Sequence, residues 1–142
     1  MENKIKLFLV DNDALFLKSM EIEFNQLGNF EIETFQKGKD CILNLKNLPD
    51  LIILDYHLAG IERNALNGLE TLDEIKSYDA NVPVIMLSSE DRIDIATNCM
   101  RHKAIYYIVK SETVFVRLQQ AIDNVFKLKK MEKKLNWYME RV

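Results

Sequence analysis

Residues Leu51-Ile52-Ile53-Leu54-Asp55 decide the fold, because four consecutive apolar side chains end in a carboxylate. An uninterrupted apolar run of this length predicts a strand that is buried on both faces. Its last residue then lies at the carboxyl edge of a sheet, where open α/β sheets place their chemistry. Asp55 is therefore the first candidate for a functional residue.

Three other apolar runs also end in polar side chains. These are Leu7-Phe8-Leu9-Val10 before Asp11-Asn12-Asp13, Val84-Ile85-Met86-Leu87 before Ser88-Ser89, and Tyr107-Ile108-Val109 before Lys110. The carboxyl ends of parallel strands meet at one edge of a sheet, so we expect these polar residues beside Asp55. Oxygens of Asp11, Asn12 and Asp55 suit Mg²⁺, while Ser88 and Lys110 suit phosphoryl oxygens. The pattern predicts a cation and phosphoryl site in which Asp55 can form an acyl phosphate.

Composition predicts one soluble domain. The chain has 142 residues, of which 48% are hydrophobic and 29% charged, with a net charge of -3 that does not favour nucleic-acid binding. No apolar run approaches the ~20 residues of a membrane span, and no signal peptide is visible. Cys41 and Cys99 fit no metal-ligand or redox spacing. We therefore expect a cytoplasmic protein without a membrane segment.

Strand and helix patterns alternate along the chain. The predicted strands are 5–10, 30–35, 51–55, 83–87 and 105–109. The predicted helices are 13–27, 38–45, 69–77, 91–102 and 113–142. This alternation predicts an α/β fold with a doubly wound, five-stranded parallel sheet. The intervening loop 56–67 is long for a compact domain, which is typical of a functional segment.

The last predicted helix is longer than one sheet face requires, so we divide the chain into a domain at 1–127 and an extension at 128–142. Apolar residues in the extension follow the a and d spacing of a coiled coil, and lysines surround them. The stripe consists of Leu128, Met131, Leu135, Tyr138 and Val142. It could fold onto its own domain, pair with a second copy or another protein, or make a basic contact with nucleic acid or membrane.

The strand-end residues resemble those of receiver domains in two-component response regulators, over about residues 4–127. The motifs that carry the resemblance are Leu9-Val10-Asp11-Asn12-Asp13, Ile52-Ile53-Leu54-Asp55-Tyr56-His57-Leu58, Asn67-Gly68-Leu69-Glu70, Met86-Leu87-Ser88-Ser89 and Tyr107-Ile108-Val109-Lys110-Ser111. The resemblance implies a (βα)5 fold and a phosphoacceptor at Asp55. It implies Mg²⁺ held by Asp11, Asn12, Asp55 and the backbone carbonyl of His57.

The resemblance also implies roles for the remaining site residues. Lys110 would bind the phosphoryl group, and Ser88 would act as the switch hydroxyl that Tyr107 follows. His57 and Glu90 match positions that tune autodephosphorylation, although His57 could equally be an ordinary exposed loop histidine. Such a protein is not an enzyme beyond Mg²⁺-dependent self-phosphorylation and autodephosphorylation.

Two kinds of partner follow from the same resemblance. A sensor histidine kinase or a phosphotransfer protein would donate the phosphoryl group. A downstream protein would bind the face formed by the fourth helix, fifth strand and fifth helix, with no direct contact to nucleic acid or membrane. The residues expected on that face are Arg92, Ile95, Asn98, Cys99 and Tyr107. The extension could add a homodimer contact.

Four features depart from the family pattern. Asn12 replaces the usual second acid, which should weaken cation binding. Ser111 replaces the usual proline after Lys110, so we expect a trans peptide bond. The loop after Asp55 is longer than usual, with Ala59 in place of a common proline. No output domain follows, and the chain could be the front part of a longer regulator.

Two other functions are compatible with the sequence. The protein could be a pseudo-receiver that acts without phosphorylation as an interaction or dimerisation module, because Asn12 removes a charge from the cation site. Alternatively, Val10-Asp11-Asn12-Asp13 fits the nucleophile motif of haloacid-dehalogenase-like phosphatases. That alternative lacks the further acidic pair after Lys110 and leaves Asp55 without a role. Phosphoryl label on Asp55 or on Asp11 separates the receiver from the phosphatase.

Overall fold

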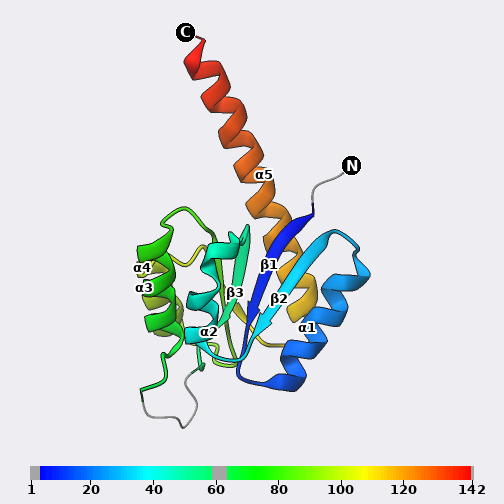
Figure 1. Ribbon diagram of the computed structural model, residues 1–142, viewed down its shortest axis with the longest axis vertical. Coiled ribbons are helices and arrows are strands. Elements are labelled where there is room, and N and C mark those ends of the chain that lie inside the picture. Colours follow the sequence, from blue (N-terminus) through cyan, green and yellow to red (C-terminus); the bar gives the residue numbers. More distant parts are fainter. Residues whose placement is uncertain (1–3, 59–63, 142) are drawn as a thin grey trace.

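Five parallel strands form one sheet in the order β2-β1-β3-β4-β5 (Figure 1). The computed structural model describes residues 4–58 and 64–141. The strands are β1 (Ile5–Val10), β2 (Phe30–Phe35), β3 (Leu51–Asp55), β4 (Val84–Ser88) and β5 (Tyr106–Val109). Because the strand order reverses between β1 and β3, the loops after these two strands diverge and leave room for a site between them.

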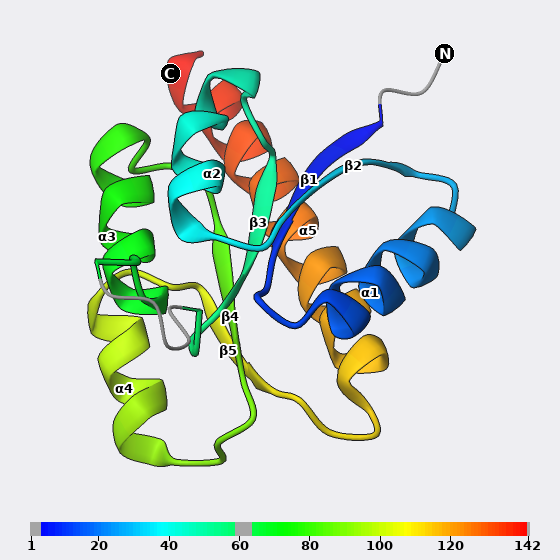
Figure 2. The same ribbon diagram turned by 60° about the horizontal axis from the view of Figure 1, so that its bottom comes forward.

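Helices cover both faces of the sheet. They are α1 (Ala14–Gln26), α2 (Gly38–Leu43), α3 (Gly68–Tyr78), α4 (Ile93–Arg101) and α5 (Val114–Glu140). Figure 2 shows α1 and α5 on one side of the sheet and α2, α3 and α4 on the other. This arrangement confirms the predicted doubly wound fold, including the long last helix.

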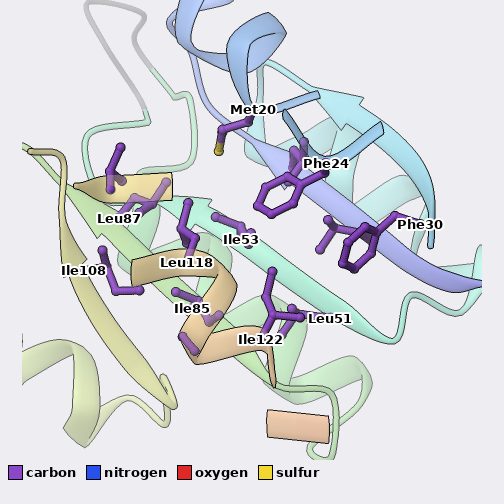
Figure 3. Packing of buried hydrophobic residues seen from close by; sticks show 14 of the residues in the cluster. Met20, Phe24, Phe30, Leu51, Ile53, Ile85, Leu87, Ile108, Leu118 and Ile122 are labelled. Carbon is purple, nitrogen blue, oxygen red and sulfur yellow. The ribbon is translucent and has the colours of Figure 1, made fainter. Parts of the chain in front are cut away.

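Alternate strand residues supply two separate hydrophobic cores. Leu7 and Leu9 of β1 point toward α1 and α5, whereas Phe8 and Val10 point toward the opposite helices, and all four are fully buried. Figure 3 shows how Phe24 of α1 lies against this first core together with residues of the sheet and α5. Burial on both faces explains why the central strands read as continuous apolar runs.

Some predicted boundaries are wrong by a few residues. The helix predicted at 38–45 ends at Leu43, and a short 3-10 turn follows at Leu45–Asn47. The helix predicted from residue 91 begins at Ile93, because Arg92 has an extended backbone. Asp13 lies before α1, where its carboxylate accepts hydrogen bonds from the N–H groups of Leu15 and Phe16, as expected of an N-cap.

The second half of α5 projects beyond the sheet, at the end opposite the carboxyl edge (Figure 1). Its last buried residue is Val125, and every described side chain from 130 to 141 is exposed. The extension therefore does not fold onto its own domain, which removes one of the three possibilities left open by the sequence. Within residues 4–58 and 64–141, no helix is both long and apolar enough to span a membrane.

Gly68 brings the start of α3 against the end of β3. The Asn67 side chain accepts from the Glu70 N–H and the Glu70 carboxylate accepts from the Asn67 N–H, which fixes the first turn of α3. A Cβ atom at Gly68 would lie 2.6 Å from the carbonyl oxygens of Asp55 and Tyr56. Only glycine allows this approach, so Gly68 holds the backbone beneath Asp55 in place.

We predict that Gly68→Ala lowers the free energy of unfolding by roughly 3 kcal/mol, because rigid backbone atoms cannot move away from the added methyl group. Urea unfolding followed by circular dichroism measures this loss. Gly28→Ala is the matched control, since Gly28 has a positive φ of 72° but no heavy atom within 4 Å of the added Cβ. It should lose about 1 kcal/mol from backbone strain alone. Equal losses would contradict the proposed contact.

Candidate functional site

Asp11 and Asp55 lie side by side at the carboxyl edge of the sheet. Asp11 follows Val10 of β1 and Asp55 follows Leu54 of β3, and these two residues are paired in register across the sheet. Asp11 is fully buried and Asp55 is 2% exposed. The N–H of Asp13 donates to Asp11 Oδ1 at 2.9 Å, and the N–H of His57 donates to Asp55 Oδ1 at 3.3 Å. The fold therefore pairs two carboxylates in a nearly dry position.

Lys110 is the cation of this site. Its Nζ donates to Asp11 Oδ2 at 2.8 Å and lies 3.5 Å from Asp55 Oδ1. The backbone of Lys110 is fixed by β4, because its N–H donates to the Ser88 carbonyl at 2.8 Å. Its ammonium group also lies 4.5 Å from the centre of the Phe16 ring, a favourable cation–π contact. The peptide bond to Ser111 is trans, as the sequence predicts, since the described residues contain no cis bond.

The site has more negative charge than it can neutralise. Burial raises the pKa of Asp11 to about 6, the hydrogen bond from Lys110 opposes this rise, and the Asp55 charge adds to it. Two carboxylates facing one ammonium leave an excess of one negative charge when both are ionised. A bound cation would relieve both the repulsion and the desolvation cost. The electrostatics thus suit a positively charged ligand at this edge.

The predicted ligands of that cation are not equally placed. Asp11 and Asp55 are buried together, whereas Asn12 is exposed and Asp13 serves as the cap of α1. Among the residues that the structure describes, no group of three His, Cys, Asp or Glu side chains could hold a metal ion. The pair of carboxylates fits Mg²⁺, which binds few protein oxygens and retains water. Any further protein oxygen has to come from an amide or the backbone.

Ser88 and Tyr107 both hold the backbone of Glu90. Ser88 is fully buried at the end of β4, and its Oγ accepts from the Glu90 N–H at 3.0 Å. Tyr107 is half-buried, and its hydroxyl donates to the Glu90 carbonyl. Burial raises the pKa of Tyr107, partly offset by its hydrogen bond with Ser88. The loop after β4 is therefore mechanically tied to both side chains.

His57 and Glu90 face each other at the rim of the site. Nε2 of His57 lies 3.7 Å from Oε1 of Glu90, and the two side chains are 45% and 40% exposed. The His57 ring also contacts Tyr56 edge-on. Ala59 and the following residues up to 63 lie outside the described residues. The side chains of His57 and Glu90 are both in contact with solvent at the rim of the site.

The expected partner face needs a correction. Ile95 and Cys99 are buried in the core beneath α4, so they are not available to a partner. Hydrophobic spacing explains the error, because they form the inward stripe of an amphipathic helix. Arg92 is exposed and pairs with Asp94 at 2.7 Å, while Asn98 and Tyr107 are partly accessible. These three are the predicted residues that remain on the surface.

Two contributors to the site escape sequence reasoning. Phe16 fits the apolar spacing of α1, and nothing in that spacing indicates its contact with the Lys110 ammonium. Gly68 occurs in a recognisable motif, but its approach to the Asp55 carbonyl appears only in three dimensions. Both effects depend on segments that are distant in sequence, so local patterns cannot reveal them.

Comparisons with known proteins agree with this geometry. The family profile of the response regulator receiver domain matches residues 7–123. Regulatory protein LuxO of Vibrio vulnificus (strain YJ016) is 30% identical over 118 residues, covering 80% of this chain and 23% of LuxO. A protein-glutamate methylesterase/protein-glutamine glutaminase of Clostridium acetobutylicum is 32% identical over 128 residues, covering 87% of this chain and 35% of that protein. The chain thus spans about a quarter to a third of these curated relatives.

Solved structures show the same fold. NtrX from Brucella abortus superposes with a TM-score of 0.83 at 25% identity, covering 96% of this chain and 30% of NtrX. CheY in its complex with CheX, BeF3 and magnesium from Borrelia burgdorferi has a TM-score of 0.77 at 23% identity, with coverage of 87% and 90%. The second likeness concerns the fold alone.

We predict that Asp11→Asn stabilises the Mg²⁺-free protein. Because folding raises the Asp11 pKa from 3.8 to about 6, ionised Asp11 opposes folding above pH 6, and this penalty disappears as the pH falls toward 4. The free energy of unfolding should therefore rise by about 1–3 kcal/mol at pH 7.5 and by much less at pH 4.5. Urea titrations at both values measure the difference.

Asp13→Asn is the matched control for this prediction. It removes an exposed carboxylate from the same loop while keeping an equally good cap for α1. Its stability should change little at either pH. Two results would show that Asp11 is not a destabilising buried charge. Either Asp11→Asn does not raise the free energy of unfolding at pH 7.5, or the increase becomes larger as the pH falls.

Proposed function

This chain belongs to the family of response regulator receiver domains, and we propose that it accepts a phosphoryl group on Asp55. The observation that carries the proposal is that the Asp55 carboxylate lies beside Asp11 at the carboxyl edge of the sheet, with the Lys110 ammonium group within 3.5 Å of both acids. A sensor histidine kinase or a phosphotransfer protein is the proposed donor. In this proposal residues 1–127 form the domain that performs the reaction, and residues 128–142 are a separate extension.

The contacts of Asp55 indicate which oxygen reacts. Oδ1 accepts from the His57 N–H and faces Lys110, whereas the described residues give Oδ2 no hydrogen bond. Oδ2 is therefore the proposed nucleophile. Its bond to phosphorus forms as the bond from phosphorus to the donor histidine nitrogen breaks, and that nitrogen later regains a proton. Lys110 would shift from Asp11 toward a phosphoryl oxygen and compensate its charge.

Mg²⁺ is the proposed cofactor of this reaction. Asp11, Asp55, Asn12 and the backbone carbonyl of His57 would hold the ion, which neutralises charge between the carboxylates and the phosphoryl group. The excess negative charge of the Asp11 and Asp55 pair supports this assignment. Asn12 contributes an amide oxygen instead of a carboxylate, so we expect weaker binding than an acid would give.

The hydrogen bonds of Glu90 suggest how the signal leaves the site. In the structure the Ser88 hydroxyl accepts a hydrogen bond from the Glu90 N–H. When a phosphoryl group is present, the hydroxyl can donate to one of its oxygens, and this movement breaks the bond to Glu90. Tyr107 is bonded to the Glu90 carbonyl and would follow the loop. The surface around α4, β5 and α5 then changes shape for a downstream protein, with Arg92 and Asn98 at its edge.

Exposed residues around the site support contact with a donor protein. Leu15 in the first turn of α1 is 82% exposed, and Ile93 at the start of α4 is 85% exposed. Both lie on segments that follow the carboxyl ends of strands, close to the site. His57 and Glu90 lie at the same rim and are proposed to control how readily water attacks the acyl phosphate. No reaction on a further substrate is proposed.

A second function is favoured by one observation. Asn12 is exposed and carries no charge, so cation binding can be too weak for phosphoryl transfer. The chain would then be a pseudo-receiver that binds partners, or a second copy, without phosphorylation. The two functions differ in whether Asp55 gains a phosphoryl group.

We predict that acetyl phosphate adds one phosphoryl group to Asp55 in the presence of Mg²⁺. Intact mass measures the adduct, and peptide mapping locates it. Asp55→Asn should abolish it, whereas Asp13→Asn, which changes a carboxylate outside the buried pair, should retain it. Label on Asp11 would contradict the assignment of the nucleophile. No adduct with either acetyl phosphate or a panel of phosphorylated histidine phosphotransfer domains would favour the pseudo-receiver.

We predict that Asn12→Asp strengthens Mg²⁺ binding roughly five- to tenfold, because one more carboxylate near the ion contributes about 1 kcal/mol even when well solvated. Calorimetric titration with MgCl₂ measures the dissociation constant, and the rate of adduct formation should become half-maximal at lower Mg²⁺. Asn29→Asp adds the same charge at an exposed residue before β2, at the opposite edge of the sheet, and should change neither value. Unchanged affinity in Asn12→Asp would place residue 12 outside the ion's ligands.

A further inference from the structure

The free end of α5 carries an apolar stripe that the receiver site does not use. We call it the outer stripe, and its described members are Leu128, Met131, Leu135 and Tyr138. They are between 54% and 61% exposed. Such a row of large apolar side chains on a projecting helix is unfavourable in water unless another surface covers it. The outer stripe therefore indicates a docking surface.

The outer stripe is distinct from the face of α5 that packs on the sheet. The packed face consists of Val114, Leu118, Ala121, Ile122 and Val125. Continued along the helix, that face reaches Lys129, Glu132 and Asn136, so it becomes polar where the sheet ends. At 3.6 residues per turn, the outer stripe lies about a quarter turn away from it. A second helix can therefore approach the outer stripe without meeting the domain (Figure 1).

We infer that the outer stripe pairs with the same stripe of a second copy, as a short parallel coiled coil. Successive members are separated by three, four and three residues, which is the spacing of a and d positions. With Leu128 at a, Lys127 and Lys134 occupy g positions, and Glu132 occupies an e position. In a parallel pair each g residue meets the e residue five positions further along the second helix.

Charge complementarity selects the parallel orientation. Two parallel copies place Lys127 of each helix beside Glu132 of the other, which forms two opposite-charge pairs. Antiparallel copies would instead place Lys134 beside Lys134 and Glu132 beside Glu132, which are repulsive pairs. The residues that flank the outer stripe thus favour one orientation and one register.

The overall charge of the extension raises an alternative occupant. Residues 127–141 contain six basic and two acidic residues, a net charge of +4, whereas residues 1–126 have thirteen basic and twenty acidic residues, a net charge of -7. An anionic lipid surface would suit the basic excess. However, Lys129, Lys130 and Lys133 lie on the side away from the outer stripe, where they stay solvated in a pair of helices.

Trp137 also argues against a lipid surface. A helix that lies in a membrane interface usually places its tryptophan on the buried apolar face. Here Trp137 lies outside the a and d positions, and its ring contacts Tyr138 edge-on and the Arg141 guanidinium, which lies 4.0 Å from the ring centre. A narrow stripe flanked by a lysine and a glutamate instead fits an identical helix. Because two heptads bury little area, we expect a reversible dimer with micromolar or weaker affinity.

Sedimentation equilibrium of the full chain over a wide concentration range tests the inference. The mean mass should rise with concentration toward that of a dimer. Met131→Glu and Leu135→Glu should leave a monomer at all concentrations, with unchanged folding because both side chains are exposed in one copy. Asn136→Glu is the matched control, since it adds the same charge at an exposed residue that continues the packed face and lies off the outer stripe. It should still dimerise.

The orientation has its own test. Lys127→Glu should weaken the dimer about tenfold, and the double variant with Glu132→Lys should restore it. Met131→Cys should form an interchain disulfide under mild oxidation, whereas Lys130→Cys, off the stripe, should not. Because Asp55 is not involved, Asp55→Asn should dimerise like the unmodified chain, which separates this inference from the proposed function.

Two results would overturn the inference. The first is a full chain that remains monomeric at every concentration. The second is a dimer that persists in Leu135→Glu. Vesicles of anionic phospholipid provide the competing arm of the test. Binding to them by a chain that does not self-associate would assign the outer stripe to a lipid surface, and that binding would weaken as salt is added.

Discussion

The constraint on which this structure depends is the burial of two carboxylates, Asp11 and Asp55, with one ammonium group between them. Each acid comes after four fully buried apolar residues of a central strand, so neither can turn toward water without disturbing the sheet. Lys110 compensates only one charge, and burial, together with the nearby Asp55 charge, raises the Asp11 pKa. Buried groups held in this way are costly for stability. That cost is typical of a site prepared for a charged ligand, since bound cation and phosphoryl group would replace repulsion by attraction.

The rest of the domain keeps this edge rigid while leaving one loop able to respond. Gly68 fixes the backbone after Asp55, and Asp13 fixes the start of α1 through its cap. By contrast, the loop after β4 is held at Glu90 by two hydroxyl groups, which can exchange partners at little cost. A change in charge at the edge is therefore expected to move this loop before it disturbs either acid.

The sequence predicts much of this architecture because buried parallel strands read as apolar runs with polar ends. That pattern places Asp11, Asp55, Ser88 and Lys110 at one edge without any knowledge of the structure. It fails where the answer depends on contacts between distant segments, as for Phe16 against Lys110. Helical periodicity likewise identifies Ile95 and Cys99 as one face of α4, but cannot tell whether that face meets the core or a partner.

The long last helix connects two surfaces with different physical demands. Its first turns begin just after Lys110 and pack on the sheet, so their position depends on the site. Its final turns lie at the opposite end of the domain, where the sheet no longer dictates which residues are apolar (Figure 1). The final turns still carry regularly spaced apolar residues, but on a different side of the helix from the packed face. The packing of one copy does not explain this second row. The two stripes of α5 therefore reflect two separate partners, its own sheet and a surface outside the domain.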